Sequence, residues 1–130
     1  MSTQYRQLDA NADQKSVTVD TALTTSDSGK TILLDAVGEA ITLPAPVAGL
    51  HYKFLVTAAV ATTSWTVAAT GALIYGSVTE AGLVQLASAE TTITIVFTKA
   101  IPGDWFTLES DGTNWYVAGQ FSVAASFTTA

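Results

Sequence analysis

The segment Trp105–Gly119, with the sequence WFTLESDGTNWYVAG, carries the clearest structural signal in the chain. Two runs of alternating apolar and polar residues flank Asp111-Gly112, and Asp-Gly between such runs is the strongest short-range indication of a β-hairpin. Because side chains alternate between the two faces of a strand, one face of this hairpin collects two large rings and two aliphatic side chains. We predict that these residues form the hairpin's share of the core: Phe106, Leu108, Trp115 and Val117.

A two-residue turn at Asp111-Gly112 also predicts the register of the hairpin. It places Leu108 opposite Trp115 and Phe106 opposite Val117. The other face is expected to be wetter and carries Thr107, Glu109, Asn114 and Tyr116.

Short alternating runs recur along the rest of the chain. The most regular is Thr92–Thr98, in which Ile93, Ile95 and Phe97 alternate with Thr92, Thr94 and Thr98. Turn residues separate the runs at intervals of roughly eight to twelve residues, and no segment keeps a helical period. The sequence therefore predicts an all-β protein, an antiparallel β-sandwich or β-barrel of about ten short strands.

A length of 130 residues is typical of one domain. We interpret residues 15–130 as a single β domain and residues 1–14, which are polar and lack periodicity, as an extended N-terminal arm. The alternative for the arm is a frayed tail, as chain termini usually are. As an arm it would lie on a neighbouring molecule, for example on a sheet edge, with Tyr5 and Leu8 as anchors.

The composition excludes several classes of function. Charged residues make up only 12% of the chain, about half the usual share, which suggests that a partner covers part of the surface. The net charge of −6 argues against nucleic-acid binding, which needs clustered cations. Threonines and glycines interrupt the uncharged segment Phe54–Thr79, so no membrane partner is expected. The absence of cysteine excludes disulfides and thiolate metal sites.

Two segments imitate ligand-binding motifs without completing them. Asp9–Asp13 has the first spacings of a calcium loop, but Gln14 and Asp20 stand where that loop needs glycine and glutamate. Gly29–Thr31 imitates the end of a phosphate loop, but position 24 is threonine and a strand rather than a helix is expected to follow. We therefore predict no metal and no cofactor.

The search for catalytic residues gives no constellation. His51 is the single histidine, and no nucleophile elbow accompanies it. Asp104, Glu109 and Asp111 gather around the hairpin, where we expect a solvated turn rather than a pair of carboxyls across a cleft. The sequence therefore predicts that the protein is not an enzyme.

Two blocks of the sequence resemble structural proteins of tailed bacteriophages. The first is Ser26–Ala59, SDSGKTILLDAVGEAITLPAPVAGLHYKFLVTAA, and the second is Ser110–Gly119, SDGTNWYVAG. The second block alone also occurs in tail-fibre proteins, whereas the first is more specific. Together they are most similar to the head decoration, or cement, proteins, and the likeness covers about residues 26–120.

The resemblance implies a non-enzymatic virion protein that binds the outside of the mature phage head and stabilises it. The expected partners are the major capsid protein and the protein itself, as a β-rich homotrimer made in the host cytoplasm and located on the virion surface. The arm is then expected to contact the capsid or a neighbour through Tyr5, Arg6 and Leu8. The alternative is a tail-fibre or adhesin-type β module that binds host surface glycans through exposed rings, for which the candidates are Trp65, Trp105 and Tyr116.

Overall fold

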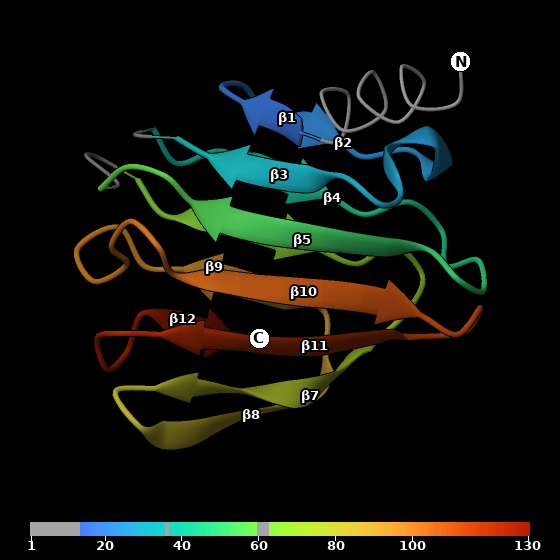
Figure 1. Ribbon diagram of the computed structural model, residues 1–130. Coiled ribbons are helices and arrows are strands. Elements are labelled where there is room, and N and C mark those ends of the chain that lie inside the picture. The colour runs from blue at the N-terminus through green and yellow to red at the C-terminus, as the bar shows by residue number, and fades with distance from the viewer. Residues whose placement is uncertain (1–13, 36, 60–62) are drawn as a thin grey trace, which may run out of the picture.

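The protein is an all-β molecule, as the sequence predicts (Figure 1). A computed structural model describes residues 14–35, 37–59 and 63–130. The described residues contain one short 3-10 turn at Thr25–Asp27. The twelve strands are β1 (Gln14–Val17), β2 (Thr21–Ala22), β3 (Thr31–Leu34), β4 (Ala40–Thr42), β5 (His51–Val56), β6 (Trp65–Ala68), β7 (Ile74–Glu80), β8 (Leu83–Glu90), β9 (Thr92–Ile95), β10 (Trp105–Ser110), β11 (Trp115–Phe121) and β12 (Phe127–Thr129).

The strands form two sheets that pack face to face as a sandwich. The larger sheet has seven strands in the order β1-β3-β5-β10-β11-β7-β8, and the smaller has five in the order β12-β9-β6-β4-β2. In Figure 1 the larger sheet faces the viewer, with β1 at the top and β8 at the bottom. In Figure 1 no strand of the smaller sheet is seen behind β7 and β8.

The first six strands alternate between the two sheets. β1, β3 and β5 lie side by side in the larger sheet, β2, β4 and β6 lie side by side in the smaller one, and all four of these pairings are parallel. β11 and β7 are also parallel. The sheets are therefore mixed rather than purely antiparallel. Apolar alternation predicts which face of a strand is buried, but it carries no information on strand direction.

The core lies between the sheets and is rich in aromatic rings. Phe106 is fully buried, and its ring stacks on Phe54 at a centroid distance of 4.6 Å. Phe121 and Phe127 contact it at 6.2 Å and 6.3 Å. Phe127 belongs to the smaller sheet, so this cluster joins the two layers.

The central hairpin has the predicted faces but a different register. Phe106, Leu108, Trp115 and Val117 are all buried on the inner face. Leu108 lies opposite Val117 rather than Trp115, and Phe106 lies opposite Gly119, so the predicted register is wrong by two residues. A shift of two residues keeps every side chain on its face.

The cause of the shift is a longer loop. Residues 111–114 lie outside both strands. The carboxylate of Asp111 accepts the N–H groups of Thr113 and Asn114, each at 2.9 Å. This side-chain capping stabilises a four-residue loop in place of the two-residue turn that Asp-Gly usually makes.

Candidate interaction surfaces

The outer face of the smaller sheet carries no charged residue on its strands, since the five strands contain neither acidic nor basic residues. Most of the inward side chains of this sheet are large and apolar, whereas the outward ones are small. Strand pairing aligns the outward residues in two rows: Ala40, Thr66, Thr94 and Thr128 in one, and Ala22, Thr42, Ala68 and Thr92 in the other.

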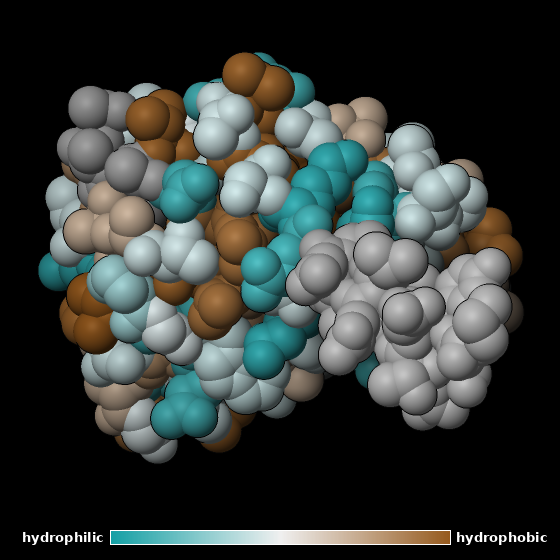
Figure 2. Space-filling model, turned by 45° about the horizontal axis from the view of Figure 1, so that its top comes forward, coloured by the Kyte–Doolittle hydropathy of each residue, from teal (hydrophilic) through white to brown (hydrophobic). Residues whose placement is uncertain are grey.

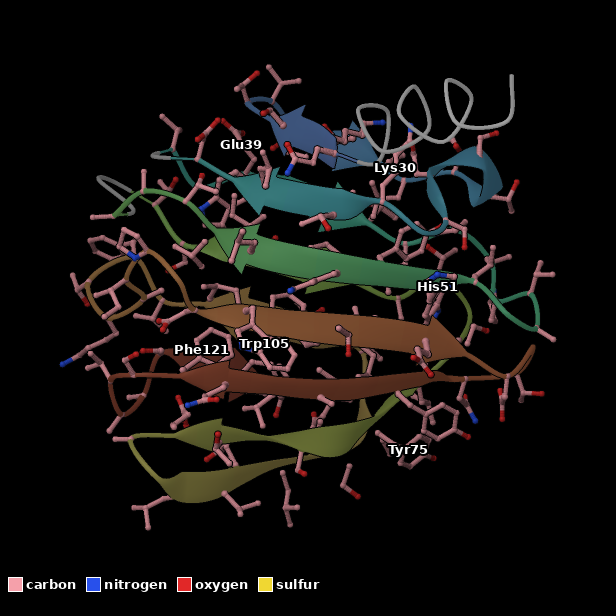
Figure 3. All side chains as sticks on the ribbon, in the orientation of Figure 1. Lys30, Glu39, His51, Tyr75, Trp105 and Phe121 are labelled. Atoms are coloured by element: carbon pink, nitrogen blue, oxygen red, sulfur yellow. The ribbon has the colours of Figure 1, made fainter. Side chains whose placement is uncertain are left out.

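The outer face of the larger sheet divides into two halves. The half formed by β5 and β10 carries His51, Lys53 and Glu109, and Lys53 Nζ lies 5.4 Å from the ring centroid of Trp105. Figure 3 shows Trp105 and His51 on this half. It is therefore an ordinary hydrated surface with both signs of charge.

The half formed by β11, β7 and β8 has no charged side chain on its outward positions. The charged residue of β8 is Glu90, at the end of the strand. Tyr75 and Tyr116 lie side by side on this half, with ring centroids 6.2 Å apart. Tyr116 is 43% exposed, and its hydroxyl donates to Asp111 at 2.9 Å. That bond raises the pKa of Tyr116, while the N–H groups of Asn114 and Thr113, together with Tyr116, lower the pKa of Asp111.

Strand β8 is the open edge of the larger sheet. It pairs with β7 alone among the described strands. Leu83, Val84 and Leu86 are 72%, 66% and 65% exposed, which makes this strand the most concentrated group of exposed large apolar side chains in the described chain. An apolar edge strand of this kind is a site for pairing with another chain.

A groove opens between the two sheets beside β8. Its volume is about 340 Å³, and it is lined by Leu83 and Gln85 on one side and by Ala124 and Phe127 on the other. Glu80 also lines this groove although it is only 7% exposed. Its carboxylate accepts the N–H of Phe127 at 2.7 Å and so links β7 to β12.

The predicted contact residues Tyr5, Arg6 and Leu8 lie outside the described residues. Of the three rings considered for glycan binding, Trp65 is fully buried on the inner face of β6, so its use as an exposed ring is excluded. Trp105 is half-buried and Tyr116 is exposed.

The acidic residues around the hairpin do not form a pair. Asp104 and Asp111 stand at opposite ends of β10, about 20 Å apart for a strand of this length. The expectation that Asp104 is solvated is wrong, because it is 2% exposed. Its carboxylate accepts the N–H groups of Ile101 and Ser122 and holds two loops together. Its role is therefore structural.

The segment Gly29–Thr31, which resembles the end of a phosphate loop, contributes Lys30 to an ion-pair cluster instead. Asp27 is buried, and its carboxylate contacts the Nζ atoms of Lys15 and Lys30, both at 3.2 Å. Burial alone would raise the pKa of Asp27, but the N–H of Thr24 and the two ammonium groups outweigh it and lower that pKa. Strand β3 follows directly, as the sequence predicts.

A further hollow of about 260 Å³ lies beside His51 and is lined by Gly49, Leu50, Glu109 and Ser110. Within the described ranges, no group of three or more histidine or acidic side chains is arranged to hold a metal ion. In the same ranges, no helix has the length and apolar composition needed to cross a bilayer. Figure 2 shows apolar and hydrophilic residues interspersed on the face nearest β1 and β2.

Comparison with protein-family models, with curated proteins and with solved structures gives no match.

Two features of these surfaces were missed in the sequence. The adjacent pair Leu83-Val84 places apolar side chains on both faces of one strand, which is typical of a strand that is covered on both faces. Glu80 carries no such signal, because the sequence does not show that a strand end is buried under a loop from the other sheet.

Proposed function

We propose that this protein is a non-enzymatic structural protein of a phage virion, a decoration protein that binds the outside of the mature head as a homotrimer. The observation that supports this most is the distribution of charge. A chain with a net charge of −6 leaves one whole sheet face and half of the other uncharged. Burying such surface against a partner has no charge-desolvation cost.

The smaller sheet is the candidate contact with the major capsid protein. Its outward threonines offer methyl groups for packing and hydroxyl groups for hydrogen bonds, on a face with no long side chain to immobilise. Five strands of two to four residues give a footprint of roughly 300 Å². A stable interface usually buries about 800 Å² on each partner. One copy is therefore expected to bind a shell weakly.

A homotrimer would supply the contact area that a single copy lacks. Three linked copies present about 900 Å² in total, and the second and third contacts form at the high effective concentration set by the first. Tight binding then requires three capsid sites at the matching spacing. A lattice that acquires this spacing only on maturation is stabilised by mass action, because the ligand binds one state and not the other.

The test uses undecorated mature shells and unexpanded precursor shells. Thr94→Lys places a charge at the centre of the smaller sheet, where we expect a loss of shell binding of at least tenfold because an unpaired ammonium would be desolvated. Thr107→Lys is the matched control, since Thr107 is equally half-buried and outward on the charged half of the larger sheet. Binding is measured by co-sedimentation, and shell stability by the melting temperature.

Three outcomes would contradict the proposal. Wild-type protein that binds both shells equally, or that does not raise the melting temperature of mature shells, is not a maturation-specific cement. Equal loss in both lysine variants would mean that the smaller sheet is not the footprint. Circular dichroism melting of each variant shows whether the fold is intact.

One observation favours the glycan-binding alternative, namely the pair of Tyr75 and Tyr116 on the outer face of the larger sheet. Stacked or adjacent rings on a flat surface are suited to the apolar faces of sugars. A glycan array separates the two functions: reproducible binding that Tyr116→Ala abolishes supports the adhesin, whereas no binding leaves decoration as the proposal.

A further inference from the structure

Strand β8 lacks the features that usually protect an edge strand from pairing with another chain. Natural edge strands are commonly protected by lysine, proline or strong bulges that twist the edge away. The exposed part of β8 has none of these, because Leu83–Ala87 contains no charge and no proline and its ladder with β7 is regular from Glu80 to Gly76. This part of the edge is therefore ready to pair with a further strand.

Glu80 adds a specific chemical requirement to that edge. Buried carboxylates are normally neutralised by a cation. The ion pairs among the described residues join Asp27 to Lys15 and Lys30, and none involves Glu80. One oxygen of Glu80 accepts the Phe127 N–H, and the side chain lines the groove. The groove is thus suited to a segment that brings a cation together with apolar side chains.

Residues 1–13 of the chain supply that combination. Arg6 is the single arginine of the protein, and Tyr5 and Leu8 flank it closely. In an extended segment Arg6 and Leu8 share one face and Tyr5 lies on the other. The exposed residues of β8 divide in the same way, because Leu83 shares the inner face with Glu80, whereas Val84 and Leu86 lie on the outer face, with Val84 at the rim of the groove.

We propose that residues 1–13 of a neighbouring copy bind along β8 as an added strand, with Arg6 paired to Glu80. Leu8 then packs on Leu83 in the groove, and Tyr5 packs on Val84 and Leu86 outside. Residue positions two strands apart are about 10 Å from each other, a distance that the long stems of arginine and glutamate together can span. The groove shields this ion pair from water.

The chain's own arm is poorly placed to make this contact. A strand added outside β8 would lie seven strand steps from β1, about 34 Å. The eight residues from Arg6 to Gln14 (14 − 6) span about 27 Å at full extension, which is too short for Arg6 of the same chain to reach that strand. A neighbouring copy needs no such extension.

This inference deepens the self-association part of the proposed function and rests on it, but it is independent of the capsid. Its tests therefore use purified full-length protein without shells.

The first experiment exploits the absence of cysteine, because every disulfide then reports an introduced pair. Leu8→Cys protein uniformly labelled with ¹⁵N is mixed with unlabelled Leu83→Cys protein under mild oxidation, so that covalent heterodimers differ in mass from both homodimers. The control replaces Leu83→Cys by Val47→Cys, which is 51% exposed in a loop distant from β8. We expect heterodimer yield at least tenfold above the control. Equal yields, or a double Leu8→Cys/Leu83→Cys variant that closes only within one chain, would overturn the proposal.

The second experiment measures the charge pair by sedimentation equilibrium. Arg6→Gln and Glu80→Gln are each expected to raise the dissociation constant of self-association at least tenfold, and the double variant no further, since both remove one interaction. Lys99→Gln is the matched control for loss of one cation. Glu80→Gln keeps an acceptor for the Phe127 N–H, and Arg6→Gln lies outside the described core. If the protein associates but Arg6→Gln has no effect, this inference fails while the homotrimer stands; a strict monomer contradicts both.

Discussion

At the scale of single residues, Asp27 shows how a carboxylate can act as a structural rather than a functional group. It lies at the point where β1, the 3-10 turn and β3 meet, and it accepts hydrogen bonds from Thr24, Lys15 and Lys30. The phenol of Tyr52 donates to the Thr24 carbonyl beside it at 2.7 Å. Burial and the negative charge of Asp27 raise the pKa of Tyr52 to about 12. This cluster attaches the first strand to the sandwich.

Asp27 is expected to make the fold acid-sensitive. Its pKa in the folded protein is below the ordinary value of 3.8, so its contribution is complete above the pKa of the unfolded chain and is lost as pH falls through the folded pKa. We expect Asp27→Asn to lower the free energy of unfolding at pH 7 by about 2 kcal/mol and to flatten the acid limb below about pH 4. Urea unfolding from pH 7 to pH 2 measures both.

The control for that prediction is Glu109→Gln, an exposed carboxyl on the outer face of β10. It should leave stability at pH 7 nearly unchanged. An acid limb that is equally steep in wild type and Asp27→Asn would show that the ion-pair cluster does not determine acid stability.

Gly119 is a second residue with a defined structural role. It faces Phe106 across the hairpin, and a Cβ there would lie 2.5 Å from the carbonyl oxygen of Trp105 and 2.6 Å from the Cβ of Phe106. Because the nearest atoms are backbone and a buried ring stem, they cannot move aside cheaply. We expect Gly119→Ala to destabilise the protein by about 2–3 kcal/mol through overpacking. Thermal unfolding measured by circular dichroism checks the value.

The adjacent Ala118 provides the control, since it is exposed on the outer face of the same strand. Ala118→Val should be nearly neutral. A Gly119→Ala protein as stable as wild type would mean that β10 and β11 separate easily, in conflict with the close packing of the aromatic cluster.

At the scale of elements, alternation predicts burial well and pairing poorly. The inward positions of β9, β10 and β11 follow directly from their period of two, because a buried face selects apolar side chains whichever strand lies beside it. The parallel pairing of β3 with β5 cannot be predicted from that pattern, because alternation of apolar and polar residues is the same for both strand directions. The hairpin register depended on the side chain of Asp111, whose loop hydrogen bonds are a tertiary detail.

The candidate surfaces can likewise be predicted from the sequence only in part. The uncharged outer face of the smaller sheet can be predicted from the alternation in Thr92–Ile95 and Trp65–Ala68. Alternation alone assigns the threonines to the outward face. The burial of Glu80 and Asp104 cannot be predicted from the sequence, because loops that cross between the two sheets cover these residues. Trp65 illustrates the ambiguity of large rings, which suit a core and an exposed platform equally until the face of the strand is known.

At the scale of the whole molecule, the net charge sets the cost of bringing copies together. Each copy carries −6, so association must overcome mutual repulsion that salt screens over about 10 Å at 0.1 M. The outward faces of the strands proposed as contact surfaces are uncharged, and salt screens the buried pair of Arg6 and Glu80 far less than exposed charges. We expect the dissociation constant of self-association to fall severalfold between about 20 mM and 150 mM salt. Light scattering at constant pH measures it, and a rise would show that exposed charge pairs dominate the interface.

The larger sheet begins with β1 at one border and finishes with β8 at the other, six strand positions apart. A contact that joins one border to the opposite border is directional, so every protomer has a donor end and an acceptor end. Such head-to-tail contacts either close into a ring or continue as a filament, and the angle between successive protomers decides which. A trimer requires a turn of about 120° at each junction. A small change in that angle would convert a closed assembly into an open one.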